Sequence, residues 1–181
     1  MNNIIKLKPN NRFLLKYTLI SIPLIIVIEF INHFVYDWLF KINILKIIFP
    51  SNESIFEHLK LCIYPTIIVY IILHHILSKK ANINLSKCII SLTSSIITNI
   101  YIVLSLYYIA SCGLNVHSLI FDISTIIIGT VLGQLIAYHL YVFLSAKNRI
   151  AIISYILLCV IIFFTTYFSF SPLNLPIFIS S

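Results

Sequence analysis

The most polar stretch of the chain, Asn52 to Lys60, gathers side chains that can perform chemistry. Glu53, Glu57 and Lys60 share one helical face, and His58 lies on the adjacent stripe. Two carboxylates four residues apart beside a histidine can hold a divalent metal such as zinc or manganese. They can equally act as a general acid and base if burial separates their proton affinities. Glu53, Glu57 and His58 are therefore candidate catalytic residues, and the alternative is an amphipathic helix start with a Glu57–Lys60 ion pair at the interface.

A second polar stripe lies on the first apolar segment. Glu29, His33 and Asp37 recur every four residues, and so they stack along one helical face. Ionisable groups at membrane depth are costly and usually face the interior of a bundle or a water-filled cavity. The stripe either handles protons, binds a metal, or packs the bundle through an acid paired with His33 or a lysine. The candidate metal ligands are His33, Glu57 and His58, and the candidate binding residues are Glu29, His33, Asp37, Asn52, Lys60 and Asp122.

The fourth apolar segment combines an acid with small residues. Asp122 opens it, and Gly129, Gly133 and Ala137 follow at four-residue spacing, which lets another helix approach closely. Asp122 is nearly aligned with Gly129, because seven residues make about two helical turns, and we expect it to face a packed neighbour. Gln134 is expected to hydrogen-bond between helices. The glycine face is also a candidate contact for a second copy of the chain or for a membrane partner.

The elements that must position these side chains are almost entirely apolar. Of the 181 residues, 60% are hydrophobic and 9% are charged, whereas a soluble domain is about 45–50% apolar and about 25% charged. A water-soluble enzyme, a secreted disulfide scaffold and a disordered tail are excluded, which leaves an integral membrane protein. With about 20 residues per spanning helix, we predict an all-α bundle that forms a single membrane domain over residues 1–181. Five spans are expected, together with a short interfacial segment at 38–50, and their approximate bounds are 17–37, 53–77, 88–110, 118–144 and 150–170.

Pro50 marks the boundary between the interfacial segment and the second span. Ser51 or Asn52 can cap the new helix, and Glu53 would then lie in its first turn, where the helix dipole favours an acid. We therefore expect Glu53 and Glu57 to lie one turn apart on the same helix.

The distribution of charge predicts the orientation in the membrane. The formal net charge is +7, but the basic residues flank the apolar segments in small groups, and so no nucleic-acid partner is expected. With the N-terminus in the cytoplasm, nine of the twelve Lys and Arg residues lie on the cytoplasmic side and all five acids lie toward the opposite face. The positive-inside rule then predicts an N-in, C-out topology. Abundant Ile, Lys and Asn residues are typical of AT-rich bacterial genomes, and the bacterial cytoplasmic membrane is the expected location.

Two neighbouring motifs carry a family resemblance, and they comprise residues 33–38 (HFVYDW), Pro50, residues 52–61 (NESIFEHLKL) and Pro65. The chain resembles a group of small multi-pass membrane proteins from Gram-positive bacteria, the domain-of-unknown-function family 6512. The resemblance extends over nearly the whole chain and includes Asp122 and the Pro172–Pro176 tail. Phe56 stands where tryptophan is expected, and no acid follows Phe178 directly. The resemblance implies the multi-pass architecture and no particular activity.

Two classes of function fit these residues. The first is a membrane-embedded hydrolase at the outer leaflet that depends on a divalent metal cofactor or on acid–base chemistry. The clustering of acids and histidines at one depth favours it, although no nucleophile or ligand spacing matches a known catalytic constellation. The alternative is a transport, sensing or accessory subunit whose polar stripe binds an ion, a proton or a lipid headgroup. In both classes the lipid bilayer is an expected partner.

Overall fold

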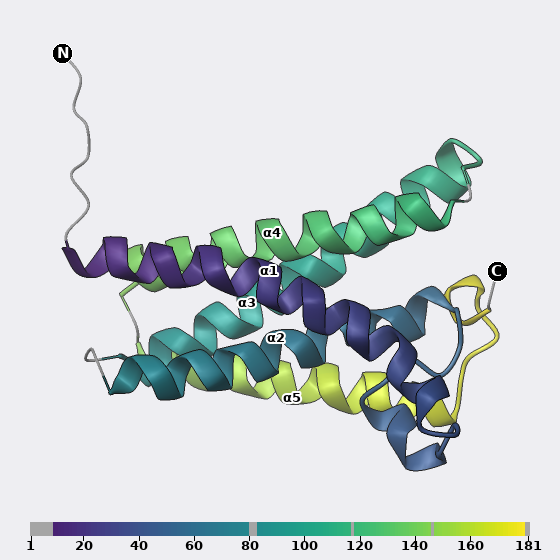
Figure 1. Cartoon of the computed structure of the whole chain (residues 1–181), viewed down its shortest axis with the longest axis horizontal. Helices are drawn as coiled ribbons and strands as arrows, with labels where there is room; N and C mark the ends of the chain where they lie inside the picture. The colour runs from purple at the N-terminus through teal and green to yellow at the C-terminus, as the bar shows by residue number, and fades with distance from the viewer. Residues whose placement is uncertain (1–8, 80–82, 117, 146, 180–181) are drawn as a thin grey trace.

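A computed structural model describes residues 9–79, 83–116, 118–145 and 147–179. Five long helices run between the two ends of the molecule (Figure 1), and they are α1 (Pro9–Trp38), α2 (Ile55–Ser78), α3 (Leu85–Tyr108), α4 (Leu119–Phe143) and α5 (Asn148–Phe170). Each contains a segment that is long and apolar enough to span a membrane. The prediction of an all-α bundle with five transmembrane helices is confirmed, and the described part of the chain contains no strand.

Three helices begin earlier than the sequence suggested, namely α1, α3 and, by two residues, α5. α1 begins at Pro9 rather than at residue 17, because basic residues that precede the apolar run are helical as well. α3 begins at Leu85 rather than at residue 88, because the Asn84 side chain caps it by accepting a hydrogen bond from the Lys87 N–H at 3.0 Å. At its other end, α3 continues into a π-helical turn, η2 (Ile109–Gly113). These additions place polar residues at the ends of the apolar spans.

The segment between α1 and α2 reverses the direction of the chain. Phe40 and Lys41 adopt the left-handed conformation, with φ of 57° and 56°, which non-glycine residues enter only at a cost. A short 3-10 helix follows, η1 (Asn43–Ile47), and none of its residues is buried. This element takes the place of the predicted interfacial segment, and it suits the boundary between lipid and water.

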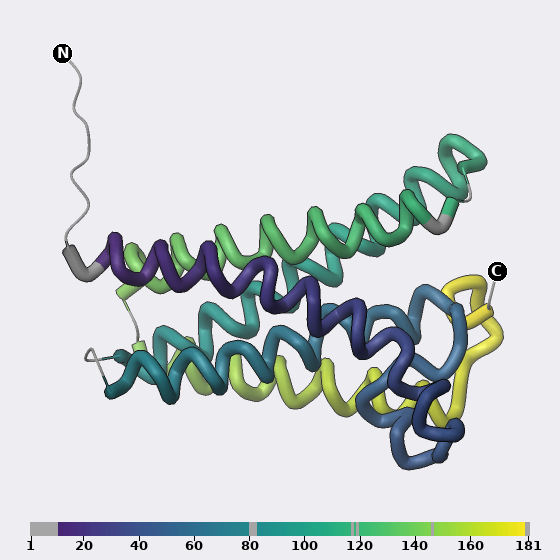
Figure 2. The backbone as a smooth tube through the Cα atoms, in the orientation of Figure 1, coloured from purple at the N-terminus to yellow at the C-terminus, as the bar shows by residue number. Residues whose placement is uncertain are grey.

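The connections alternate between the two ends of the bundle, as Figure 2 shows. The start of α1 lies at the same end as the α2–α3 and α4–α5 turns, where Lys79 and Lys147 flank the turns and Lys87 lies in the first turn of α3. The α1–α2 connection, the α3–α4 turn and the C-terminal tail lie at the other end, which we call the acidic end. The acids at this end are Asp37, Glu53, Glu57 and Asp122. The acidic end also holds Lys41, Lys46 and Lys60, whereas no acid lies at the opposite end of the described chain.

The small residues of α4 pack against α3 of the same chain, and these two helices form the most extensive helix pair. A Cβ at Gly129 would collide with the amide oxygen of Asn99, and a Cβ at Gly133 would lie 2.7 Å from the Ser95 carbonyl oxygen. Ala137 is buried as well. The close approach expected from the four-residue spacing is made within the chain, and α3 covers the face that was a candidate contact for a second copy or a partner.

The C-terminal tail packs back onto the acidic end. Phe178, at the end of the short helix η3 (Pro176–Phe178), has its ring centroid 4.3 Å from that of Phe56 and 5.7 Å from that of Phe168. These aromatic contacts join the tail to α2 and α5, and they hold the first turn of α2 in place beside the candidate site.

Candidate metal centre

Three side chains with metal-binding atoms converge at the acidic end, namely His33 of α1, His58 of α2 and Glu53 of the segment before α2. The Nε2 atoms of the two histidines lie 3.4 Å apart. Glu53 Oε2 lies 3.5 Å from His58 Nε2 and 3.8 Å from His33 Nε2. Two ligands about 2.1 Å from a tetrahedral zinc ion lie roughly 3.4 Å apart. The three atoms therefore have nearly the spacing of three corners of a zinc coordination tetrahedron.

A backbone contact orients the His58 ring. Its Nδ1 lies 2.8 Å from the carbonyl oxygen of Ser54, the residue that precedes α2. A carbonyl oxygen only accepts hydrogen bonds, and so Nδ1 carries the proton and Nε2 of the neutral ring presents a lone pair. Metal-binding histidines are commonly held in this way, with the second ring nitrogen donating to a carbonyl or a carboxylate. His58 is thus prepared to act as a ligand through Nε2.

The position of Glu53 differs from the sequence-based expectation. α2 begins at Ile55 and not at residue 53, because Ser54 is the cap and its Oγ accepts a hydrogen bond from the Glu57 N–H at 3.3 Å. The Asn52 side chain accepts a hydrogen bond from the Ser54 N–H at 2.9 Å, which holds these residues in a turn. Glu53 therefore lies outside the helix, and its carboxylate joins the two histidines.

The cluster borders a cavity of about 320 Å³ between α1, α2, α3 and α4. Apolar walls come from residues such as Val103 and Ile126, and the polar lining includes Tyr107 and Asp122. The Glu53 side chain is 62% exposed, whereas the His33 and His58 side chains are 22% and 14% exposed. The cluster is accordingly open to solvent on the side of Glu53 and enclosed on the side of the histidines.

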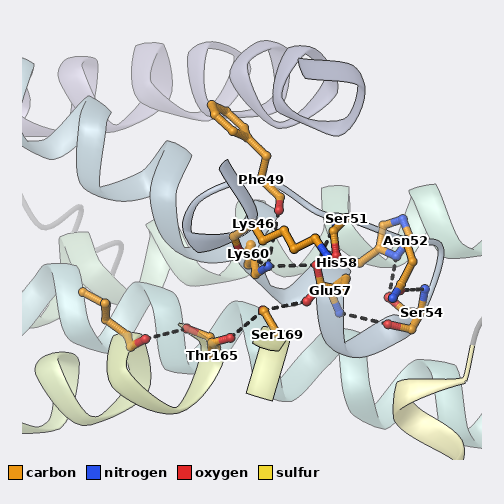
Figure 3. A network of polar contacts seen from close by, with 11 residues as sticks. Lys46, Phe49, Ser51, Asn52, Ser54, Glu57, His58, Lys60, Thr165 and Ser169 are labelled. Atoms are coloured by element: carbon orange, nitrogen blue, oxygen red, sulfur yellow. Dashed lines mark hydrogen bonds and ion pairs between the residues drawn. The ribbon is translucent and has the colours of Figure 1, made fainter. Parts of the chain in front are cut away.

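Glu57 has a different set of partners, although it is the neighbour of His58 in sequence. Its Oε2 accepts hydrogen bonds from Lys60 Nζ at 2.8 Å and from the Ser51 N–H and hydroxyl at 2.7 and 2.8 Å (Figure 3). Its Oε1 accepts a hydrogen bond from the Ser169 hydroxyl of α5 at 2.7 Å. Glu57 is only 3% exposed. The structure thus brings Glu53, and not Glu57, together with the two histidines.

Lys60 completes the arrangement that we call the Glu57–Lys60 anchor, which consists of Glu57, Lys60, Ser51 and Ser169. The Lys60 side chain is fully buried and also donates to the backbone carbonyls of Lys46 and Phe49, the latter at 3.3 Å. Its three N–H groups therefore have three acceptors. The anchor joins η1, the turn before α2, α2 and α5, and it is a buried ion pair rather than the interfacial pair considered above.

The other candidate residues lie around the cluster or below it. Asp37 pairs with Lys41 at 3.3 Å on the surface. Asp37 and Asn52 line a second hollow of about 290 Å³, to which His33 and Glu53 also contribute. Glu29 lies one turn before His33, is buried, and accepts a hydrogen bond from Thr130 at 2.7 Å. None of these three residues belongs to the group of converging ligand atoms that the described chain contains.

Sequence reasoning did not single out several residues that complete these sites. Tyr107 lines the cavity, Ser169 bonds to Glu57, and Asn99 lies in the polar layer around Glu29. An amide inside an apolar span is costly unless it is paired. The position of Asn99 in such a span therefore indicated, from the sequence alone, that it would have a polar partner. The sequence contained no such indication for Ser169, because a serine near the end of a spanning helix can form a hydrogen bond with the backbone of its own helix.

Comparison with known proteins identifies a family and no characterised relative. No curated protein and no solved structure matches this chain. The model of one protein family, described as a family of unknown function (DUF6512), matches residues 6–181. That range includes the whole ligand cluster, the cavity lining and the Glu57–Lys60 anchor, and it agrees with the resemblance carried by the motifs at 33–38 and 52–61. The chain therefore belongs to the DUF6512 family.

Proposed function

We propose that this multi-pass membrane protein binds a divalent metal ion of the zinc class through His33, Glu53 and His58 and uses it to hydrolyse a substrate. The observation that carries the proposal is the spacing of three ligand atoms at 3.4 to 3.8 Å, with the His58 lone pair directed by Ser54. Catalytic zinc sites typically have three protein ligands and an open fourth position, and two histidines with one carboxylate are a known set.

The surroundings of the cluster support a hydrolytic role. A zinc ion would lower the proton affinity of a bound water, which makes a nucleophile available near neutral pH. Asp122 lines the same cavity and is proposed to accept the proton of that water, while the Tyr107 hydroxyl can donate to a substrate carbonyl. Apolar walls beside polar groups suit an amphipathic ester or amide that enters from the membrane boundary. In this proposal Glu57 and Lys60 hold the frame and do not touch the substrate.

One observation favours the alternative, a transport, sensing or accessory subunit. Glu53 lies outside the helices and its side chain is 62% exposed. A ligand on a short solvent-exposed turn can leave and return, which suits reversible binding of an ion. Stoichiometric metal without hydrolytic activity, combined with rapid exchange, would support this second function.

Metal analysis of the purified protein tests the ligand assignment. After chelation and titration with zinc in detergent, the wild type should bind stoichiometric metal, and His58→Ala should lose it. Glu53→Gln should bind more weakly. His75→Ala is the matched control, because His75 is exposed in the last turn of α2 at the opposite end of the bundle. Wild-type protein without metal, or a His58→Ala variant with unchanged affinity, would contradict the metal site.

A hydrolysis assay separates the two functions. Fluorogenic esters and amides in mixed micelles should be cleaved by the zinc-loaded protein and not by the chelated protein. Asp122→Asn should abolish cleavage while metal binding persists. If zinc binds and no member of the panel is cleaved, the reversible ion-binding function is favoured instead.

We further propose the N-in, C-out orientation, because the basic turns lie at one end of the bundle and the acids at the other. Single cysteines at two exposed positions test it in a variant whose four native cysteines are replaced by alanine. Asn43→Cys should react with an impermeant maleimide on intact bacterial cells, and Lys79→Cys should react only after permeabilisation. The reverse pattern would overturn the orientation and, with it, the placement of the acidic end outside the cytoplasm.

A further inference from the structure

A second polar site lies deeper in the bundle, where α1, α3 and α4 meet. The Thr130 hydroxyl donates to Glu29 Oε1 at 2.7 Å and accepts from Asn99 Nδ2 at 2.9 Å. All three side chains are almost completely buried, with exposures of 3% for Glu29, 1% for Thr130 and 1% for Asn99. These three side chains are therefore almost completely shielded from water.

Two oxygen atoms of this site lack hydrogen-bond partners. They are Glu29 Oε2 and Asn99 Oδ1, and both are buried. An amide oxygen and an ionised carboxylate are acceptors only, and so neither can satisfy the other. Cys62 of α2 lies within electrostatic range of Glu29, but no basic side chain pairs with Glu29 in the part of the chain that the structure describes. An ionised carboxylate with one oxygen unpaired would be costly at this depth.

The adjacent polar layer shows the contrast. There Ser21 donates to Gln134 Oε1 at 3.1 Å, and Gln134 Nε2 donates to the Ser95 hydroxyl at 2.8 Å. Gln134 thus connects α1, α4 and α3 as the sequence led us to expect, and its amide both donates and accepts. The Glu29 layer joins the same three helices, but it lacks a hydrogen-bond donor for Glu29 Oε2 and Asn99 Oδ1.

We propose that Glu29 binds a proton, and that the resulting Oε2–H donates to Oδ1 of Asn99. A single proton taken from solvent forms one O–H bond, removes the buried charge and supplies both unpaired acceptors with a partner. Thr130 keeps its bond to Oε1. The proton also adds no volume to an interface where Gly129 already lacks a side chain beside Asn99. Glu29 is thus a proton-binding site that latches α1 to the α3–α4 pair, and this inference does not depend on the metal site.

Infrared spectroscopy of the purified protein tests this inference directly. At neutral pH the wild type should show the carbonyl stretch of a protonated carboxylic acid, with the expected shift in heavy water. The band should be missing from Glu29→Gln and retained in the control Glu53→Gln. Asn99→Ala, which keeps the acid but removes its acceptor, should move the band to higher frequency. A wild-type spectrum without such a band, or a band that persists in Glu29→Gln, would overturn the proposal.

Stability measurements give an independent outcome. Glutamine matches the protonated acid, since its amide can donate to Asn99 and accept from Thr130, and so Glu29→Gln should melt at the wild-type temperature or above it. Glu29→Leu should melt lower, because Thr130 and Asn99 lose their partner. A Glu29→Gln variant that fails to fold would contradict a neutral Glu29. A melting temperature that rises with sodium or lithium, relative to choline at equal ionic strength, would replace the proton by a monovalent cation.

Discussion

Glu57 and His58 are adjacent on α2, and their surroundings differ in kind. The Glu57 carboxylate accepts four hydrogen bonds, from Lys60, from Ser169 and twice from Ser51. The His58 Nε2 atom lies 3.4 Å from His33 Nε2 and 3.5 Å from Glu53 Oε2, and these are themselves ligand atoms. Both residues are polar groups of the same motif, but only one has its hydrogen-bonding capacity filled by the chain.

This difference separates a structural role from a binding role. A buried group whose donors and acceptors are all paired within the chain has nothing left for a ligand, whereas convergent lone pairs need a cation between them. Figure 3 shows that the Glu57–Lys60 anchor draws partners from the turn before α2 and from α5. The anchor therefore fixes the start of α2, and α2 in turn presents His58. Three substitutions test whether the Glu57–Lys60 anchor is structural and the cluster around His58 binds the ligand.

The largest effect is expected from Lys60→Met, which leaves the Glu57 charge buried without its cation. Breaking a buried ion pair in this way costs roughly 3–5 kcal/mol of unfolding free energy. Combining it with Glu57→Leu should restore much of the loss, because no buried charge then remains. Reversible unfolding in detergent measures these values, with His58→Ala as the comparison. Equal losses for Lys60→Met and His58→Ala would remove the distinction between the two sides of the motif.

An intermediate effect is expected from Ser169→Ala on α5. It deletes one hydrogen bond to the Glu57 carboxylate, and hydrogen bonds to charged groups contribute about 1.5–3 kcal/mol. Zinc affinity should stay unchanged, because Ser169 belongs to the anchor and not to the ligand cluster. Ser171→Ala, at an exposed position just beyond the same helix, is the control for stability. A loss of zinc binding in Ser169→Ala would show that the two sides are not independent.

The smallest effect is expected from Ser54→Ala. Ser54 contacts both residues, because its hydroxyl caps the Glu57 N–H and its carbonyl oxygen contacts His58 Nδ1. Loss of the cap to the Glu57 N–H should cost about 1 kcal/mol. The partner of His58 Nδ1 is the backbone carbonyl of residue 54, which alanine retains, and so zinc affinity should be preserved. Ser54→Thr keeps the cap and should be neutral in both measurements. Calorimetric titration that finds zinc binding weakened as strongly as in His58→Ala would contradict the backbone assignment.

Much of the architecture could be read from the sequence, because a bilayer demands apolar helical spans with internal hydrogen bonds. The bundle of five helices, the segment between the first two and the interhelical role of Gln134 followed from spacing and hydropathy. The sequence did not predict that Glu53, rather than Glu57, is the carboxylate that lies beside the two histidines. Ser51, Asn52 and Ser54 are all good caps, and hydrogen bonding among them, which depends on the fold, selects Ser54. The Glu57–Ser169 bond joins residues 112 positions apart, which no local pattern indicates.

That long-range bond has a consequence for biosynthesis. Glu57 is inserted into the membrane before Ser169 has been translated. The hydrogen bond from Ser169 to the Glu57 carboxylate can therefore form only after α5 has been inserted. The anchor is complete only once α5 has been made. A chain that is terminated before α5 therefore lacks the Ser169 donor, and it leaves the Glu57 carboxylate of the ligand-bearing helix incompletely paired in the bilayer, where membrane quality control can recognise it.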